Sequence, residues 1–517
     1  MTTANNTTAE KMAPLDKSAQ VSVIGAGTMG AGIAQIAAAY GHPVILFDQN
    51  PEAIQRGLDH IKKGLQGQVK RGKMTEEALE ALLANITPAT DIAALADCKL
   101  VIEAIIEDLG IKRGLLANLE ATCSADCILA TNTSSISVTA LGAEMANPER
   151  LVGMHFFNPA PIMKLVEIVS GLATSTDVAE QTHATASAWG KQAVYTKSTP
   201  GFIVNRVARP FYAESLRIYE EGAADIATLD QLIKGAGGFR MGPFELMDLI
   251  GHDVNYAVTC SVFDAYYQDP RFLPSLTQKA LVECGRLGRK SGYGFYDYSE
   301  GAEKPAAATV SGGNTPSEVQ AVGDLGIAND LIARIEAKGI KVEKQASESE
   351  SYIKVGNARL CLTDGRFATE VAASGNQNTA LFDLAIDYGT ASALAVSFAD
   401  QCDDNAKQDV IGLFNALDIN LSVVDDIPGL VLMRTVAMLA NEASDAVNQG
   451  VCTAADADIA MRGGVNYPKG PLAWADAVGV SHIFNCLSNL QQCYGEDRYR
   501  PSALLRRNYF AGAAFHD

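Results

Sequence analysis

The sequence lacks any uninterrupted run of eighteen apolar residues, and charged residues make up only 20% of it while 48% are hydrophobic. The absence of such a run excludes an ordinary membrane-spanning helix, and the composition excludes an intrinsically disordered chain. Residues 1–17, rich in Thr, Asn and Ala, lack the basic start and apolar stretch of an export signal. We therefore expect a disordered tail at 1–17, a globular protein beyond it and a cytoplasmic location.

Cysteine and positive charge are both scarce. The ten cysteines are scattered, and Cys123 and Cys127 have no histidine or second cysteine pair nearby at a metal-binding spacing, so we expect no metal and no disulfide. Lysine and arginine number 41 against 60 acidic residues, which gives a formal charge of −19. Such a chain repels nucleic acid and anionic membranes, and an anionic substrate requires a local basic patch.

The 517 residues exceed one ordinary core and indicate three or four domains. Over 18–199, short apolar runs alternate with helical stretches, which predicts an α/β, Rossmann-type doubly wound sheet. The expected strands are VSVIG at 21–25, VILFD at 44–48, KLVIEAI at 99–105 and CILATN at 127–132. Over 200–299 the periodicity becomes helical, which predicts an all-α domain that buries Ile203, Val207, Phe211, Leu216 and Ile218.

An internal repeat follows a Pro-, Gly- and Ala-rich linker at 300–318. PGFIVNR at 200–206 returns as PGLVLMR at 428–434, and GPFELMDLIG at 242–251 returns as GPLAWADAVG at 470–479. Both pairs are offset by 228 residues (428 − 200 and 470 − 242), so we expect a second copy of the all-α domain at 425–517. Between the copies, YIKVG, LFDLAI and ALAVSFA indicate a small α/β domain at 319–424 without a phosphate-loop motif.

A glycine-rich loop follows the first expected strand and opens a helix. Its GxGxxG pattern, GAGTMG, permits a tight turn and brings backbone N–H groups close to a pyrophosphate, although a plain turn is the alternative. Asp48 ends the next strand, where a carboxylate accepts hydrogen bonds from an adenosine ribose and repels a ribose phosphate by about 4 kcal/mol. The loop therefore predicts NAD rather than NADP. The expected contacts are Gly25, Gly27, Thr28, Met29, Gly30 and Asp48.

His155 begins HFFNPAPIMKLVEIV, in which an Asn-Pro turn leads to a strand that carries Glu167. We expect the return strand to bring this carboxylate beside the imidazole, where it would fix the tautomer and stabilise an imidazolium. Imidazoles in general titrate near neutral pH, which suits a base that takes the proton of a secondary alcohol. A lone histidine is otherwise more often a core residue.

Seven motifs, in order, resemble the NAD-dependent 3-hydroxyacyl-CoA dehydrogenase family. They are GAGTMGAGIA, VIEAIIED, TNTSS, HFFNPAPIMKLVEIV, TPGFIVNR, MGPFELMDLIG and GRKSGYGFYDY, and they cover about 20–298. The resemblance implies oxidation of a (3S)-3-hydroxyacyl-CoA to the 3-oxoacyl-CoA, with hydride passing to NAD. His155 and Glu167 match the catalytic pair, Ser134 a serine that bonds the reacting oxygen, and Asn205 a polar residue that completes that site.

The resemblance also implies further cofactor contacts, at Glu107, Lys112, Asn158 and Lys290. Without it, Ser134 and Asn205 fit caps of a turn or helix equally well, and Lys112 a solvated surface. For the coenzyme A phosphates we expect contacts from the basic helical run after Asp48, although such a run is usually a solvated face. The candidates are Lys62, Lys63, Lys70 and Arg71, with Lys73 in the same run.

The second all-α copy has Met433 where the first has Asn205, so we expect it to be non-catalytic. In family members with one helical domain, that domain pairs two chains. The resemblance therefore implies that the duplicate supplies a pairing surface within one chain. The sequence does not decide whether whole chains also pair as a homo-oligomer, most simply a dimer. Long members of the family with a duplicated helical domain, as this chain has, resemble the bacterial 3-hydroxyadipyl-CoA dehydrogenases of phenylacetate catabolism. A 3-hydroxybutyryl-CoA dehydrogenase and a non-catalytic NAD-binding protein are the alternatives.

Overall fold

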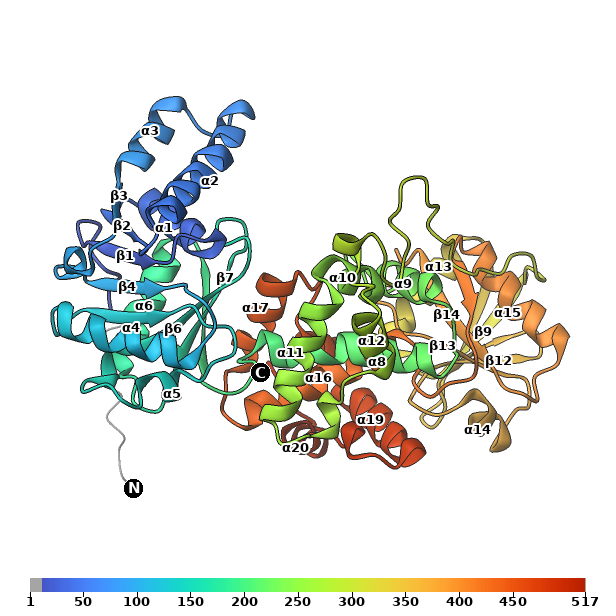
Figure 1. The fold of residues 1–517 in the computed structure, drawn as a ribbon. Helices are drawn as coiled ribbons and strands as arrows, with labels where there is room; N and C mark the ends of the chain where they lie inside the picture. Colours follow the sequence, from blue (N-terminus) through green and yellow to red (C-terminus); the bar gives the residue numbers. More distant parts are fainter. Residues whose placement is uncertain (1–11, 517) are drawn as a thin grey trace, which may run out of the picture. The chain divides into compact units, whose positions relative to one another are not determined.

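The computed structural model describes residues 12–516 and divides them into two compact units (Figure 1). The first unit contains the chain up to Val204 together with Gly450–Val465, and the second contains Asn205–Gln449 and the chain from Asn466 onward. Within the described residues, no helix has the length and apolar character needed to cross a bilayer. Residues 1–11 of the expected tail lie outside the described part, and by Leu15 the chain has joined the fold, because its backbone N–H donates to Thr185 Oγ1 at 3.0 Å.

The first unit contains an eight-stranded sheet in the order β3-β2-β1-β4-β5-β6-β7-β8. Its neighbours pair in parallel except β6 and β7, which are antiparallel. The predicted Rossmann-type sheet is therefore confirmed. The strands are β1 (Val21–Ile24), β2 (Val44–Phe47), β3 (Ile86–Ala89), β4 (Leu100–Glu103), β5 (Ile128–Thr131), β6 (Leu151–Phe156), β7 (Leu165–Ser170) and β8 (Gln192–Lys197).

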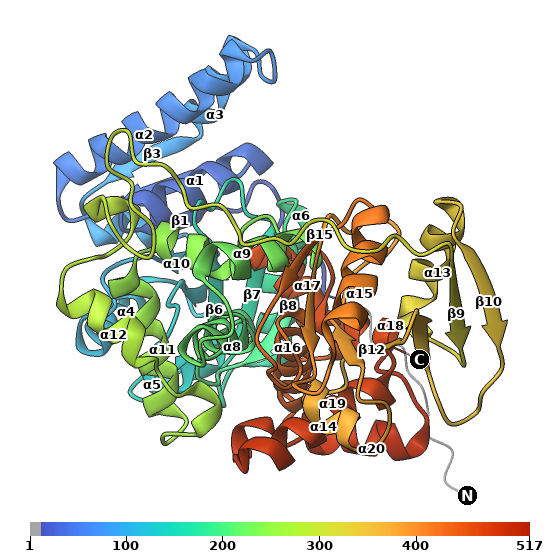
Figure 2. The ribbon, with the colours of Figure 1, turned by 90° about the vertical axis from the view of Figure 1, so that its right-hand side faces the viewer.

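Helices pack against this sheet, and two of them extend away from it as a hairpin, α2 and α3 (Figures 1 and 2). The hairpin begins where Asn50 caps α2, and Thr75 caps α3 in the same way, each by accepting a backbone N–H. The helices are α1 (Thr28–Tyr40), α2 (Pro51–Lys70), α3 (Glu76–Ala84), α4 (Leu109–Thr122), α5 (Val138–Gly142), α6 (Thr176–Ala188) and, from the second all-α copy, α17 (Ala454–Val465), which packs on β7 and β8.

The second unit combines both all-α copies with a seven-stranded sheet in the order β10-β9-β11-β12-β13-β14-β15. The helices are α7 (Val204–Val207), which begins at the last residue of the first unit, α8 (Arg209–Glu220), α9 (Ile226–Gly235), α10 (Pro243–Ile250), α11 (His252–Ala265), α12 (Leu276–Glu283), α16 (Leu432–Asn448), α18 (Pro471–Val478), α19 (Val480–Tyr494) and α20 (Ala503–Ala511). All five residues predicted to form the buried face of the first copy are buried.

The second sheet lies with helices α13 (Asn329–Ala337), α14 (Ala368–Ala373) and α15 (Asp404–Ala416), and β9 and β10 form its outer edge beside α13 (Figure 2). Its strands are β9 (Glu318–Val322), β10 (Lys341–Gln345), β11 (Tyr352–Val355), β12 (Ala358–Leu362), β13 (Thr379–Phe382), β14 (Ala393–Phe398) and β15 (Asn420–Val423). The sequence analysis found β11, β13 and β14 and missed the other four strands, β9, β10, β12 and β15, which have four or five residues each. In β10 most side chains are polar and exposed.

The structure extends the repeat beyond the helices. The bounds of α18 follow those of α10 by 228 residues, and so do the bounds of β14 after β7 and of α15 after α6. The duplicated region therefore begins inside the α/β sheet, at β6 and β13, and continues through the all-α copies without a change of register. The sequence matches used above covered the helical part alone.

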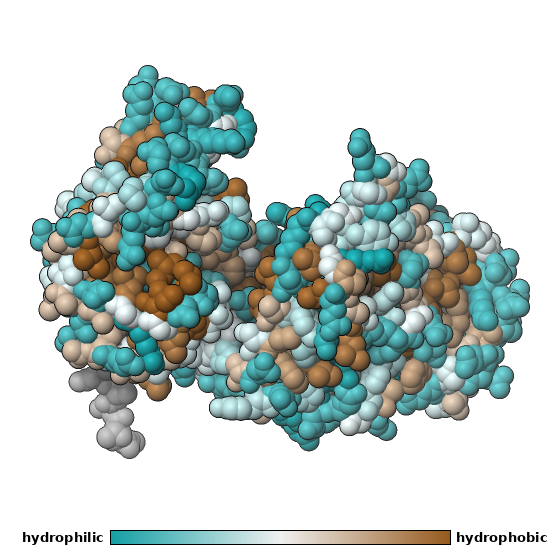
Figure 3. Space-filling view, viewed as in Figure 1, coloured by the Kyte–Doolittle hydropathy of each residue, from teal (hydrophilic) through white to brown (hydrophobic). Residues whose placement is uncertain are grey.

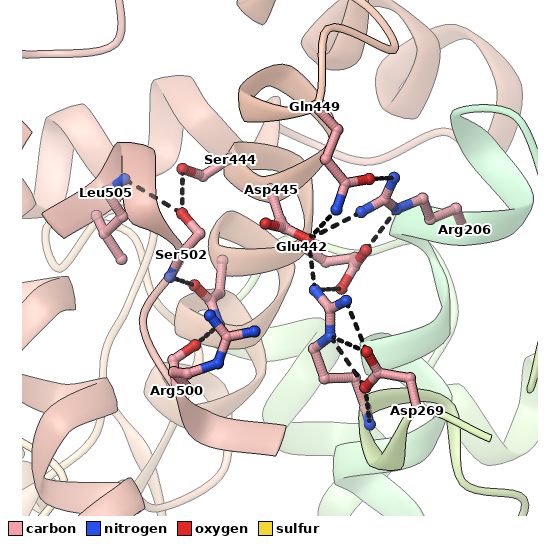
Figure 4. Close-up of polar contacts among 11 residues, drawn as sticks. Arg206, Asp269, Glu442, Ser444, Asp445, Gln449, Arg500, Ser502 and Leu505 are labelled. Carbon is pink, nitrogen blue, oxygen red and sulfur yellow. Dashed lines mark hydrogen bonds and ion pairs between the residues drawn. The ribbon is translucent and has the colours of Figure 1, made fainter. Parts of the chain in front are cut away.

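The two all-α copies face each other through α8 and α16, and a buried arginine from each copy reaches the acids of the other. Arg206 donates to Glu442 at 2.5 Å and to Asp445 at 3.1 Å, and its third nitrogen donates to Gln449 at 2.9 Å (Figure 4). Arg434, the residue 228 positions later, donates to Glu214 at 2.9 Å and bonds Glu221 with two nitrogens. The pattern is that of a two-fold interface within one chain.

Arg206→Met tests this interface. It leaves Glu442 and Asp445 buried with less compensation, so we expect a loss of about 3–5 kcal/mol in the stability of the second unit. Chemical unfolding followed by circular dichroism measures the loss. Arg507→Met, at an exposed position, is the matched control. Equal stability of the two variants would contradict the interpretation.

Candidate active site

His155 and Glu167 face each other across the antiparallel pair β6 and β7, where they are direct Cα partners. Residues opposite each other on such a pair point to the same face of the sheet, so their side chains meet. The distance from His155 Nδ1 to Glu167 Oε2 is 2.7 Å. The return strand thus brings the carboxylate beside the imidazole, as the spacing in the sequence predicts.

Glu167 is fully buried and is held on its other side by the backbone. Its Oε1 accepts the N–H groups of Ile203 and Val204, each at 3.0 Å. The imidazole of His155 packs against Phe157 and Phe202, with ring centroids at 4.5 and 5.7 Å. Because Nδ1 donates to the carboxylate, Nε2 is left as the acceptor nitrogen, and the aromatic rings keep the imidazole in one orientation.

Glu107 gathers the TNTSS segment around one carboxylate. Its Oε1 accepts from Thr133 Oγ1 at 2.6 Å, from Ser134 N at 2.9 Å and from Ser135 N at 3.2 Å. Burial alone would raise the pKa of Glu107, but these hydrogen bonds and the charge of Lys112 outweigh it, and the pKa lies below its usual value. Ser134 is thereby fixed at the end of β5 with an exposed side chain.

Lys112 is not on a solvated surface, which was the alternative reading of its sequence. It is 1% exposed, and its Nζ donates to both oxygens of the fully buried Glu103, at 2.7 and 2.9 Å. It also lies 3.4 Å from Glu107. Sequence reasoning missed Glu103, although a glutamate at the end of an apolar strand in VIEAIIED was a visible signal. We infer that Lys112 acts by positioning Glu107.

The glycine loop has the shape that a dinucleotide pyrophosphate requires. A Cβ on Gly30 would lie 1.7 Å from Gly25 O, and Gly25 has φ +97°, so both positions need glycine. A Cβ on Gly27 would meet nothing within 4 Å, and this residue precedes α1 as its N-cap and offers no side-chain hydrogen bond. Open space in front of free helix N–H groups fits an anionic pyrophosphate, so the residues present fit NAD.

Asp48 stands beside that loop. Its Oδ2 accepts from Ala26 N at 2.9 Å, and its Oδ1 accepts from Asn50 N at 2.9 Å. Asp48 and Gly25 line a cavity of about 620 Å³ whose other walls include Ile92, Ile106 and Ile111. Hydrophobic surface is visible on this part of the first unit, below the α2–α3 hairpin (Figure 3). Isoleucine side chains for an adenine and the Asp48 carboxylate for its ribose suit the adenosine half of NAD, and Asp91 is a second acid in the lining.

A second cavity of the first unit, of about 550 Å³, is basic although the chain is strongly acidic. Its lining includes Lys63 and Arg71, which were expected to contact coenzyme A, and also His60 and Lys73. Lys62 and Lys70 are exposed on the same helix and do not line it. The position of each residue around the helix decides whether its side chain lines the cavity, and a list of basic residues does not reveal this position.

The remaining candidates are distributed over both units. Asn158 is exposed after β6. Asn205 begins the second unit, directly after Val204. Lys290, also in the second unit, pairs with Asp253 at 2.5 Å. Asn132, which the sequence analysis missed, accepts the N–H of Phe156 at 2.8 Å and so fixes the end of the strand that carries His155.

Family models cover most of the chain. The NAD binding domain of 3-hydroxyacyl-CoA dehydrogenase matches residues 20–199, and the C-terminal domain of the same family matches 201–298 and again 429–514. The chain belongs to the 3-hydroxyacyl-CoA dehydrogenase family. It is an NAD-dependent oxidoreductase. A reduced Rossmann-fold domain of 3-hydroxybutyryl-CoA dehydrogenase matches 360–428, which identifies the part whose nature the sequence alone left open.

Relatives of this dehydrogenase carry two substrate names. It is 46% identical to the 3-hydroxyadipyl-CoA dehydrogenase of Escherichia coli over 94% of this chain and 96% of that one. It is 40% identical to a probable 3-hydroxybutyryl-CoA dehydrogenase of Bacillus subtilis over 54% of this chain and 98% of that one. The crystal structure of a 3-hydroxybutyryl-CoA dehydrogenase from Escherichia coli superposes with a TM-score of 0.87 at 44% identity, covering 96% of this chain and 99% of that one.

The second half of the dehydrogenase lacks the residues that are the catalytic candidates of the first half. At the offset of 228, Asp383 stands where the first half has His155, and Ala395 where it has Glu167. The equivalence is structural as well, because Asp383 N donates to Ala395 O across β13 and β14, the pair that corresponds to β6 and β7. With Met433 at the position of Asn205, the second half has no imidazole, no glutamate and no amide at the three equivalent positions.

Asp48→Ser tests the preference for NAD. It removes the charge that repels a ribose phosphate, so we expect the ratio of kcat/KM for NADP to that for NAD to rise at least about tenfold. Steady-state NADH and NADPH formation measures the ratio. Asp91→Ser removes another acid that lines the same cavity and is the control. An unchanged ratio in Asp48→Ser, or an equal rise in Asp91→Ser, would contradict the assignment.

Proposed function

We propose that this dehydrogenase oxidises (3S)-3-hydroxyadipyl-CoA to 3-oxoadipyl-CoA, a step of phenylacetate catabolism, with His155 as the base. The observation that carries the proposal is the His155–Glu167 pair, buried at the end of β6 and β7 in the sheet that bears the glycine loop. Spectrophotometric NADH formation with 3-hydroxyadipyl-CoA and 3-hydroxybutyryl-CoA tests it. Formation of NADH from neither substrate would refute it.

His155 takes the hydroxyl proton of the substrate on Nε2 as the alcohol becomes a ketone. Bound NAD supplies the hydride acceptor for the hydrogen on C3, so that the alcohol loses two electrons and two hydrogens in total. Glu167 keeps the proton on Nδ1 of the neutral ring and stabilises the imidazolium that forms. The two backbone N–H groups on Oε1 of Glu167 prevent the carboxylate from turning away.

Ser134 provides a hydroxyl for the reacting oxygen of the substrate. Its backbone is held by Glu107, so the hydroxyl is positioned before the substrate binds. A donor already aimed at the oxygen that becomes a ketone lowers the cost of reorganisation during the reaction.

Coenzyme A binds at the basic cavity beside α2 in this proposal. Lys63, Arg71 and Lys73 carry positive charge there, and the net charge of the chain is negative elsewhere. Clefts lined by one sign of charge concentrate ligands of the other sign, here the phosphates of the coenzyme. The acyl part then has to reach His155, which belongs to the same unit.

The substrate names of the relatives favour two acyl chains. The 46% identical relative, which is matched over nearly its whole length, is named for 3-hydroxyadipyl-CoA. Shorter relatives and the superposed crystal structure are named for 3-hydroxybutyryl-CoA. We place the adipyl substrate first because the relative named for it is matched over nearly the whole of both chains, whereas the Bacillus subtilis relative matches 54% of this chain. The full-length crystal structure is named for the butyryl substrate, which we keep as the second candidate.

His155→Gln removes the base, so we expect kcat to fall about 10²–10⁴-fold. Glu167→Gln keeps an oxygen for the two backbone N–H groups and loses the negative charge on Nδ1, so kcat should fall while the protein stays folded. Steady-state kinetics and thermal unfolding measure both effects. His482→Gln, in the second copy, is the control and should keep full activity; a wild-type kcat in His155→Gln would disprove the role.

Lys63→Ala combined with Arg71→Ala tests the coenzyme site. We expect KM for the acyl-CoA to rise at least about tenfold at low salt, with less difference from wild type at high salt because the attraction is screened. Lys62→Ala combined with Lys70→Ala removes the same charge from the same helix outside the cavity. If both double variants raise KM equally, the effect is one of net charge and the site is disproved.

A further inference from the structure

Helix α17 comes from the second all-α copy but belongs to the first compact unit, together with the sheet of His155 and Glu167. It packs on β7, the strand that carries Glu167, and on β8 beside it. The backbone fixes the entry to this helix, because Lys197 N, at the end of β8, donates to Val451 O at 3.0 Å. A segment of the second copy is therefore part of the body that holds the candidate base.

The closest approach of α17 to the sheet is at Gly464, which lies inside the helix and is buried. A Cβ on Gly464 would lie 2.7 Å from Leu165 Cδ2, 3.1 Å from Val204 Cγ2 and 3.5 Å from Phe157 Cε1. Glycine inside a helix is unfavourable by about 0.5–1 kcal/mol relative to alanine. The position therefore needs glycine for space, because a methyl group would force its buried neighbours to move.

Each of the three side chains that meet Gly464 is tied to the candidate catalytic pair. The ring of Phe157 packs on the imidazole of His155, with the ring centroids 4.5 Å apart. The N–H of Val204 donates to Glu167 Oε1 at 3.0 Å. Leu165 precedes Glu167 by two residues on β7, so their side chains point to the same face of the sheet. One layer of side chains thus separates α17 from the pair.

The same helix-on-sheet contact occurs a second time, within the second unit. Helix α9 of the first copy packs on β14, the strand that follows β7 by 228 residues. A Cβ on Gly235 of α9 would lie 2.6 Å from Ala393 Cβ. Gly235 corresponds to Gly463 and Ala393 to Leu165, since 463 − 235 and 393 − 165 are both 228. Each copy therefore covers the sheet of the other with the same helix.

The two contacts differ in the side chains that lie between helix and sheet. The second half has Ala385 at the position of Phe157 and Ala393 at the position of Leu165. Both alanines are buried, so a closed contact forms there without a ring. Packing of the helix alone therefore does not require large side chains. The half that contains His155 has them, and its phenyl ring touches the imidazole.

We propose that α17 of the second copy is a positioning element for the His155–Glu167 pair, with Gly464 as the residue that lets the helix press on the intervening side chains. The inference rests on the proposed function of His155 as the base. It gives the second copy a part in the reaction although that copy lacks the candidate catalytic residues. A base that is held in one place meets the hydroxyl proton in the geometry that transfer requires.

Gly464→Val tests the positioning by kinetics. We expect kcat to fall about 10²-fold, the usual cost of a misplacement by about 1 Å, while KM for NAD stays unchanged because the glycine loop is not touched. Gly114→Val is the matched control, since a Cβ on this glycine inside α4 would meet nothing within 4 Å. Thermal unfolding verifies that both variants are folded. A wild-type kcat in Gly464→Val, or an equal loss in Gly114→Val, would overturn the proposal.

A second substitution distinguishes pressure at this contact from general damage. Gly464→Val adds three carbons to the contact and Leu165→Ala removes three, so the double variant restores its volume. Because the two positions touch, we expect kcat of the double variant to recover at least about tenfold over Gly464→Val. If Gly464→Val does not fold, Gly464→Ala is paired with Leu165→Val in the same way. Absence of any recovery would overturn the role of the contact.

Hydrogen–deuterium exchange separates this proposal from the proposed function. Peptides that contain Ile203 and Val204, whose N–H groups Glu167 holds, should exchange faster in Gly464→Val and unchanged in Gly114→Val. Peptides from the glycine loop should keep their wild-type rates in both variants. Unchanged exchange at Ile203 and Val204 in Gly464→Val overturns the positioning whatever the NADH assay shows. Failure of the NADH assay alone removes the function and leaves the exchange result standing.

Discussion

One buried carboxylate, that of Glu167, organises the candidate active site of this protein. It holds the imidazole of His155 through one oxygen and the backbone of Ile203 and Val204 through the other. The same group thus fixes the orientation of the His155 ring and the point at which the chain leaves the sheet for the helices. A buried carboxylate is tolerated only with such partners, and here all of them are supplied by neighbouring strand and turn.

The second half of the chain shows that holding the backbone N–H groups does not require holding an imidazole. Asp383, at the position of His155, accepts the N–H groups of Val431 and Leu432, the residues that correspond to Ile203 and Val204. Burial raises the pKa of Asp383 to about 6, although the N–H groups oppose the rise. The backbone constraint is therefore kept by a carboxylate from the opposite strand, because buried N–H groups need an acceptor whether or not chemistry takes place.

Much of the first half follows from the sequence because its signals are local. Apolar strands, a glycine loop and a His–Glu pair separated by one turn need no knowledge of distant contacts, and the family motifs add the remaining candidates. The division of the basic helix into residues inside and outside a cavity depends on helical phase, which composition does not show.

The covalent joining of the two all-α copies has a consequence for how their interface can change. In a symmetric pair of identical chains every substitution is made twice, whereas in this chain each side of the contact is encoded separately. Gln449 faces Arg206 where Glu221 faces Arg434, and Tyr467 corresponds to Phe239. One copy therefore carries a buried hydroxyl where the other carries a plain phenyl ring, an asymmetry that a homodimer of identical chains cannot encode.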